Sequence, residues 1–160
     1  MIKINFYCIG NLKEKYLREN FEEFSKRLSK FAQIKVFEFK EKQIIETDNK
    51  DLVNNFLEDE DKVILEKIKK DDYVILLDLH GKSLSSEEFA KKINDVISSL
   101  RGEISFVIGG TLGVSNSLRN RADFKLKLSD MTFTHQFTRI ILIEQIYRAF
   151  KINNNESYHH

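Results

Sequence analysis

Short apolar runs alternate with amphipathic stretches along the whole chain, and this alternation restricts the fold more than any other feature of the sequence. The apolar runs have the length of strands, and the stretches between them repeat apolar residues at the spacing of one helix face. Such alternation is typical of an α/β domain with a mainly parallel sheet flanked by helices. We predict strands at residues 2–9, 34–39, 73–77, 104–108 and 124–128, and helices at 13–30, 52–68, 85–100, 115–121 and 135–152.

Length and composition limit both the organisation and the partners. The 160 residues suit one ordinary domain, and no repeat or Ser-rich linker marks a boundary, so we expect a single domain over residues 1–160. The 26 basic and 25 acidic residues give a net charge of +1. A basic field over the whole surface is therefore excluded, and any nucleic acid must be held by a local patch or by a site shared between subunits.

Several classes of protein are excluded or disfavoured by what the sequence lacks. It has no signal-peptide pattern and no apolar run near the ~20 residues of a membrane span, which predicts a cytoplasmic protein without a membrane partner. Cys8, the single cysteine, is expected to be a buried and inert thiol. We expect no metal, because His159 and His160 are adjacent and no third ligand stands at zinc-like spacing from them.

Three polar or glycine-containing stretches follow predicted strands, at residues 77–82, 108–113 and 128–133. Ligands of parallel sheets usually bind beyond the carboxyl ends of the strands, so these stretches are the first candidates for a binding site. Gly109-Gly110-x-x-Gly113 could be a plain tight turn or could let a ligand approach the backbone. It lacks the lysine of a P-loop, and it matches a dinucleotide-binding fingerprint only partly, through Asp130.

Two helix starts are marked by capping residues. Ser85 and Glu88 have the spacing of a capping box, and Thr134 is suited to cap the final helix. His135 and Arg139 then share a face of its first turns, where they could serve acid–base or anion-binding chemistry or could simply lie on a capped helix with a surface arginine. The same helix is apolar nearly all round, which predicts burial on more than one side. Within it Glu144 and Arg148 are expected to form an ion pair.

Taken in order, several segments match one known family. They are Val107-Ile108-Gly109-Gly110-x-x-Gly113, Leu128-Ser129-x-Met131-Thr132-Phe133-x-His135, Arg139, Ile143-Glu144-Gln145-Ile146-Tyr147-Arg148-Ala149 and Tyr158-His159. The chain resembles the ribosomal RNA large subunit methyltransferase H family, the pseudouridine N3-methyltransferases of the SPOUT class. The resemblance covers the whole chain.

The resemblance implies properties that periodicity does not show. It implies a C-terminal trefoil knot, a homodimer and S-adenosylmethionine (SAM) as cofactor. The implied substrate is a pseudouridine of 23S rRNA within the large subunit or the 70S ribosome. The family's cofactor positions fall on Leu77, Gly109, Leu128, Ser129, Asp130, Met131, Thr132 and Phe133.

Methylation of an imide nitrogen requires a group that takes the N3 proton or stabilises the uracil anion. The resemblance makes His135 and Arg139 the catalytic candidates from the final helix, and Tyr158 and His159 the candidates from the tail. We expect the tail to reach the partner's site. The remaining expectations concern two surfaces: a dimer seam with Ile140, Ile143 and Tyr147, and an rRNA patch with Arg119, Arg121, Lys125 and Lys127.

Two residues depart from the family pattern, and three other functions stay open. Thr134 stands where the family usually has proline, and His160 stands where it commonly ends in Lys or Arg. The alternatives are a SPOUT methyltransferase of a different RNA position, a non-catalytic ribosome-binding assembly factor, and an oxidoreductase suggested by the glycines.

Overall fold

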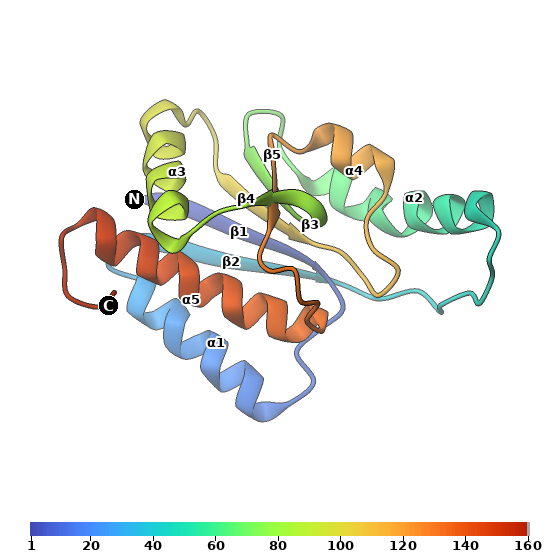
Figure 1. Cartoon of the computed structure of the whole chain (residues 1–160), viewed down its shortest axis with the longest axis horizontal. Helices are drawn as coiled ribbons and strands as arrows, with labels where there is room; N and C mark the ends of the chain where they lie inside the picture. Colours follow the sequence, from blue (N-terminus) through green and yellow to red (C-terminus); the bar gives the residue numbers. More distant parts are fainter. Residues whose placement is uncertain (160) are drawn as a thin grey trace.

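A five-stranded parallel sheet forms the centre of the computed structural model, which describes residues 1–159 (Figure 1). The strands lie in the order β2-β1-β4-β3-β5, and every neighbouring pair is parallel. Their bounds are β1 Ile2–Ile9, β2 Ala32–Phe39, β3 Tyr73–Ser83, β4 Ile104–Ile108 and β5 Phe124–Lys127. The predicted α/β class with a parallel sheet is confirmed.

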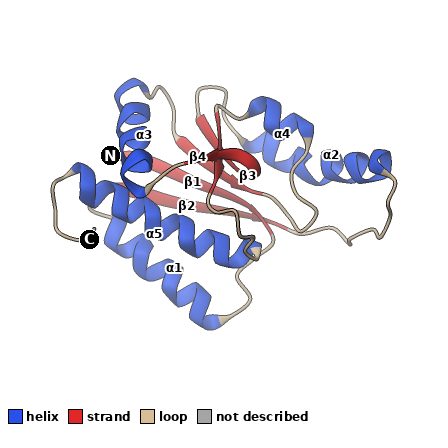
Figure 2. Ribbon diagram, in the orientation of Figure 1, coloured by secondary structure: helices blue, strands red, loops and turns tan. Residues whose placement is uncertain are grey.

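Helices cover both faces of this sheet (Figure 2). On one face α5 lies between α1 and α3, and on the other face α2 packs against α4. Their bounds are α1 Lys15–Leu28, α2 Lys50–Lys67, α3 Ser86–Ser99, α4 Asn116–Arg121 and α5 His135–Asn153. The predicted caps are present, since Ser85 and Glu88 form a capping box and Thr134 accepts a hydrogen bond from the Phe137 amide at 3.3 Å.

The two faces carry separate apolar cores, because successive side chains of a strand point to opposite sides. In β4, Phe106 enters the core under α1, α3 and α5, whereas Val107 enters the core under α2 and α4. The first core is the larger, and aromatic rings lie close together in it, with Phe6 and Phe106 centred 5.8 Å apart. Burial on both faces explains why the central strands read as continuous apolar runs.

Helix α5 is buried by its own chain, which corrects one expectation. Ile143 is fully buried and Tyr147 nearly so, both in the core shared with α1 and α3. Neither side chain can form the expected dimer seam, because the flanking helices already cover it. Of the three residues, only Ile140 is partly exposed. The predicted burial on more than one side is thus confirmed, because α1 and α3 both pack against this helix, and the cover comes from within the chain.

Two further features differ from the sequence-based expectation. Strand β3 continues past Leu77 to Ser83, so Gly81 lies in a strand and not in the expected turn. A Cβ atom on Gly81 would be 2.7 Å from the Lys125 carbonyl, which shows that glycine permits the close approach of β5. On α2, Glu60 and Asp61 are buried, although charged residues of an amphipathic helix are expected to face away from its apolar stripe.

No helix within residues 1–159 has the length and apolar character needed to cross a membrane. Across the same residues, no cluster of three or more His, Cys, Asp or Glu side chains is arranged to hold a metal ion.

Candidate functional site

The last part of β3 and the stretches that follow β4 and β5 lie at one edge of the sheet. Leu76 is paired with Val107 of β4, and Leu77 is paired with Leu126 of β5. In this register Gly109 lies one residue beyond the position opposite Leu77, and Leu128 follows Leu126 by two residues. The expectation that these stretches adjoin is met by the sheet register.

The turn after β4, residues 109–113, is closed by a hydrogen bond from the Gly113 amide to the Gly110 carbonyl at 3.1 Å. Gly113 has φ +105°, a conformation that L side chains rarely adopt. A Cβ atom on Gly109 would be 2.6 Å from Val114 Cγ1 and 2.7 Å from the Gly113 carbonyl oxygen. The turn is therefore tight, and its glycines are required by space as well as by backbone conformation.

The loop after β5 presents apolar side chains to solvent. Met131 is 77% exposed and Phe133 is also exposed, although both are large and hydrophobic. The loop is shaped locally by a hydrogen bond from the Met131 amide to Ser129 Oγ at 3.0 Å. Asp130 is exposed and paired with Lys127 at 2.5 Å. Exposed apolar side chains beside a strand end suit a ligand or a second protein surface.

His135, at the start of α5, lies beside the ends of other strands. A Cβ atom on Gly10, which follows β1, would be 3.3 Å from His135 Nε2 and 3.9 Å from Glu41 Oε2. Glu41 in turn accepts hydrogen bonds from the Thr111 amide at 3.0 Å and the Thr111 hydroxyl at 2.5 Å. Burial opposes the charge of Glu41, but these hydrogen bonds and nearby His135 lower its pKa. His135 is thereby placed next to the glycine turn.

Arg139 is a buried residue, so the alternative of a surface arginine is wrong. Its Nη1 is 2.6 Å from Glu38 Oε2, and its Nη2 donates to the Gly10 carbonyl at 3.3 Å. Its Nε has no partner within the described residues. The predicted burial of the Cys8 thiol is confirmed, and this burial raises its pKa to about 12.

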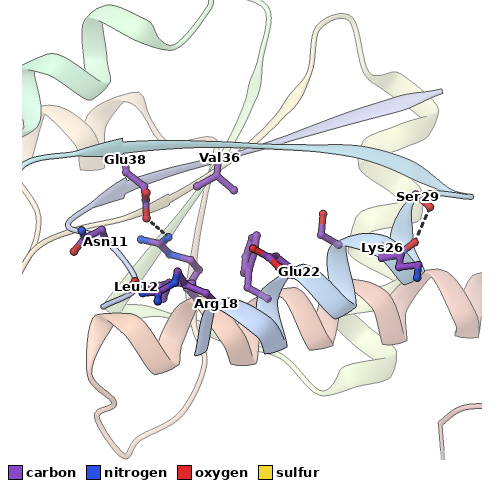
Figure 3. A pocket seen from close by; sticks show the side chains of 11 residues that line it. Asn11, Leu12, Arg18, Glu22, Lys26, Ser29, Val36 and Glu38 are labelled. Atoms are coloured by element: carbon purple, nitrogen blue, oxygen red, sulfur yellow. Dashed lines mark hydrogen bonds and ion pairs between the residues drawn. The ribbon is translucent and has the colours of Figure 1, made fainter. Parts of the chain in front are cut away.

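Arg139 also lines a groove of about 740 Å³ between α1 and β2. Figure 3 shows Arg18 and Glu22 of α1 facing Val36 and Glu38 of β2 across this groove. None of the predicted cofactor residues lines it. The Arg139 side chain thus borders the groove between α1 and β2, while His135 lies next to the glycine turn.

The tail lies at the opposite end of α5. Tyr158 donates to Glu144 at 3.1 Å, and burial together with Glu144 raises its pKa. His159 Nδ1 is 3.0 Å from Arg148 Nη1, and His159 Nε2 is 2.6 Å from Glu87 of α3. The expected Glu144–Arg148 ion pair is present at 2.6 Å.

The four predicted catalytic residues thus form two pairs. The tail pair contacts Glu144 and Arg148, which follow Arg139 and His135 by 5 to 13 residues, or about 8 to 20 Å along α5 at 1.5 Å per residue. One chain therefore does not bring His135 and Arg139 together with Tyr158 and His159. His160, which departs from the family pattern, lies outside the described residues.

Most of the predicted rRNA patch is engaged within the chain. Arg119 pairs with Asp78 at 3.2 Å, and Lys127 pairs with Asp130. Arg121 donates to the backbone carbonyls of the segment before β3, at Lys69, Lys70 and Asp72. Only Lys125 of the four is classed as exposed.

Sequence reasoning missed the acidic residues behind the glycine turn. Glu60 accepts from the Lys42 amide at 3.2 Å, and Asp61 accepts from the Ser115 amide at 2.7 Å. Both carboxylates are buried. The available signal was the acidic run at residues 58–61, which interrupts the apolar spacing between Leu57 and Ile64.

The sheet is parallel, and its carboxyl edge carries a glycine turn, an exposed Met-Thr-Phe loop and the start of a buried final helix. This arrangement is consistent with a SPOUT methyltransferase. A family model described as a predicted SPOUT methyltransferase matches residues 2–159, and the chain belongs to this family.

More similar relatives place the chain within one branch. It is 44% identical over 158 residues to the ribosomal RNA large subunit methyltransferase H of Clostridioides difficile (strain 630), and 44% identical over 158 residues to that of Clostridium novyi (strain NT). In each case the alignment covers 99% of both chains. The chain is therefore a member of the ribosomal RNA large subunit methyltransferase H family.

Solved structures support the fold alone. A probable methylase family protein from Haemophilus influenzae Rd KW20 matches with a TM-score of 0.53 at 12% identity, covering 99% of this chain and 70% of that chain. The Legionella pneumophila protein Lpg2936, solved in complex with bound SAM, matches with a TM-score of 0.50 at 11% identity, covering 93% of this chain and 66% of that chain.

Proposed function

We propose that this protein is a SAM-dependent methyltransferase that methylates N3 of a pseudouridine in 23S rRNA on the assembled ribosome. One observation carries the proposal: relatives named ribosomal RNA large subunit methyltransferase H align over 99% of the chain at 40–44% identity. The geometry supports it, because the three stretches with the family's cofactor positions meet at one sheet edge.

The residues at this edge fit a bulky, partly apolar cofactor. Any side chain on Gly109 would collide with the turn, and the Met131 and Phe133 side chains are exposed beside it. We assign cofactor binding to Leu77, Gly109, Leu128, Ser129, Asp130, Met131, Thr132 and Phe133. Bound SAM supplies an electrophilic methyl group on a sulfonium.

The chain's own residues must handle the N3 proton. His135, held between Gly10 and the Glu41–Thr111 contact, is placed to accept it or to hydrogen-bond the uracil oxygen. Arg139, buried beside Gly10, orients the same helix start and supplies positive charge toward the developing anion. Both roles depend on placement at hydrogen-bond distance in the substrate complex.

The separation of the two residue pairs supports a homodimer. A two-fold axis near the middle of α5, perpendicular to the helix, would place the tail end of one copy beside His135 of the other. Tyr158 and His159 would then complete the partner's site from their positions on Glu144, Arg148 and Glu87. We propose a cytoplasmic protein in which residues 1–160 form one knotted domain and in which the reaction needs no metal.

Transfer of a labelled methyl group from SAM to purified 70S ribosomes, 50S subunits and free 23S rRNA tests this function. We expect labelling of ribosomes lacking the modification and little labelling of free rRNA, with mass mapping giving 3-methylpseudouridine. Label at another nucleoside would indicate a SPOUT enzyme of different specificity. Ribosome binding without SAM binding in calorimetry would indicate a non-catalytic assembly factor and would refute the proposal.

A further inference from the structure

Behind the glycine turn lies a set of carboxylates that the proposed reaction does not use. They come from α2 and from the segment after β2, and each contacts the turn or its flanks. We propose that Glu60 is a positioning residue for the cofactor, acting through the Gly109–Gly113 turn, with Glu41 holding Thr111 in the middle of that turn and Asp61 holding Ser115 just after it. This inference rests on the proposed function, because its effect is read in SAM binding.

Glu60 is in close contact with the turn. Its side chain is buried, with 3% of the residue exposed, and a Cβ atom on Gly110 would be only 2.7 Å from Glu60 Oε1. That oxygen has no hydrogen-bond partner among the described residues. A methyl group at Gly110 would therefore meet a carboxylate oxygen, so that Glu60 or the turn would have to shift.

The second oxygen of Glu60 connects α2 to the far side of the turn. It accepts from the Lys42 amide at 3.2 Å, and the preceding residue, Glu41, accepts from both the amide and the hydroxyl of Thr111. Glu60 thus fixes the backbone of residues 41–42, and these residues fix Thr111. The position of Thr111 within the turn therefore depends on α2, through the carboxylates of Glu60 and Glu41.

The exit of the turn is held by the same helix. Asp61 is fully buried and accepts from the Ser115 amide at 2.7 Å, and Glu58 accepts from the Ser117 amide at 3.1 Å. One oxygen of Asp61 also lacks a partner within the described residues. Burial raises the pKa of both Glu60 and Asp61. Buried carboxylates with unpaired oxygens are unfavourable for folding, which supports a role in shaping the adjacent turn.

A double-mutant cycle between Glu60 and Gly110 tests the contact. Gly110→Ala pushes a methyl group against Oε1, and Glu60→Ala removes both the obstacle and the Lys42 hydrogen bond. We expect each single change to weaken SAM binding about tenfold, the effect of one lost charged hydrogen bond or an equivalent displacement. The double variant should bind within about threefold of the weaker single variant, because the methyl group occupies the freed space.

Two further variants separate positioning from general destabilisation. Glu60→Gln keeps an oxygen for the Lys42 amide, so it should restore SAM affinity to within about threefold of the wild type. Asp59→Asn is the matched control, because Asp59 belongs to the same acidic run but is exposed and contacts only the Lys42 side chain. It should bind SAM as the wild type does.

Three measurements decide between the outcomes. Calorimetry gives the affinity for SAM, thermal unfolding without SAM gives the midpoint, and assays on ribosomes give kcat and the KM for SAM. A rise in KM that matches the weaker SAM affinity, with kcat unchanged, supports positioning of the cofactor. Wild-type affinity in Glu60→Ala, additive losses in the double variant, or a lower midpoint with unchanged affinity would overturn it. Absence of SAM binding in the wild-type protein would refute the proposed function itself, which is a distinct result.

Discussion

The two faces of the sheet are built differently. Under α1, α3 and α5 the core is extensive and apolar, with Phe6, Phe106 and Leu142 completely buried. Under α2 and α4 the core is smaller, and carboxylates replace apolar side chains where it reaches the glycine turn. Hydrophobic burial scales with area, so the first face contributes most of the stability. Carboxylate hydrogen bonds are directional, so the second face can fix the position of a loop.

This difference also locates the parts of the site. His135 and Arg139 enter from the apolar face, on the helix that this core holds most firmly. The glycine turn enters from β4 and is held from the opposite face by α2. A rigid helix and a loop positioned by hydrogen bonds therefore meet at the sheet edge. Perturbing one face should change stability first, and perturbing the other should change binding first.

The largest effect is expected at the turn itself. Gly109→Val should abolish SAM binding, because even its Cβ atom would lie 2.6 Å from Val114 Cγ1 and 2.7 Å from the Gly113 carbonyl, which forces the turn out of place. Calorimetry measures the loss, and circular dichroism should show that the sheet persists. Retained affinity would mean that the pocket lies elsewhere.

The next prediction compares the two cores through two neighbouring residues of β4, one in each core. Phe106→Ala should lower the free energy of unfolding by about 3–5 kcal/mol, because it leaves a large cavity. Val107→Ala, on the opposite face, should lower it by only about 2 kcal/mol. Urea denaturation measures both. Equal losses would contradict the division into a stabilising face and a positioning face.

The sequence predicts the fold well because hydrophobic periodicity encodes it. All five strands and all five helices lie where the apolar spacing places them, and the Ser85–Glu88 and Thr134 caps fix two helix starts. The continuation of β3 through Gly81 was missed because it depends on pairing with β5, which no local pattern records. The mistaken seam at Ile143 and Tyr147 has a similar cause, since periodicity shows that a face is buried but not what covers it.

The site was only partly predictable. Strand ends and glycines marked one edge of the sheet, and the sheet register brings these stretches together. The burial of Arg139 against Glu38 and the contact of Glu60 with Gly110 join residues about 50 to 100 positions apart in the sequence. Such contacts depend on tertiary packing, which a single sequence does not reveal.

A smaller effect is expected at the far end of the apolar face. His159→Ala should reduce turnover on ribosomes by about tenfold or more if the ring serves proton transfer in the partner's site. SAM affinity and the thermal midpoint should stay near the wild-type values, because within the described residues His159 forms hydrogen bonds with the side chains of Arg148 and Glu87 and lies outside the apolar core. Ser157→Ala, two residues earlier and exposed, is the control. Normal turnover of His159→Ala would show that the tail takes no part.

The smallest effect is a pH dependence of stability on the positioning face. Burial raises the pKa of Glu60 in the folded protein, so the folded state binds more protons than the unfolded state above the ordinary glutamate pKa. Wild-type stability should therefore fall as pH rises through this window, by at most about 1.4 kcal/mol per pH unit for one proton. Glu60→Gln lacks this titration, so its stability relative to the wild type should increase with pH.

The matched control for this titration has the opposite sign. The hydrogen bond and charge of Lys42 lower the pKa of exposed Asp59, so this carboxylate adds stability above its ordinary pKa and loses it as pH falls. Asp59→Asn should therefore be slightly less stable than the wild type at neutral pH and equal to it in acid. Glu41 and Asp61 face Glu60 and are present in all three proteins, so each difference reports the substituted carboxylate together with its coupling to these neighbours. Parallel urea curves from pH 4 to pH 8 would show whether a buried carboxylate destabilises this face while its exposed neighbour does not.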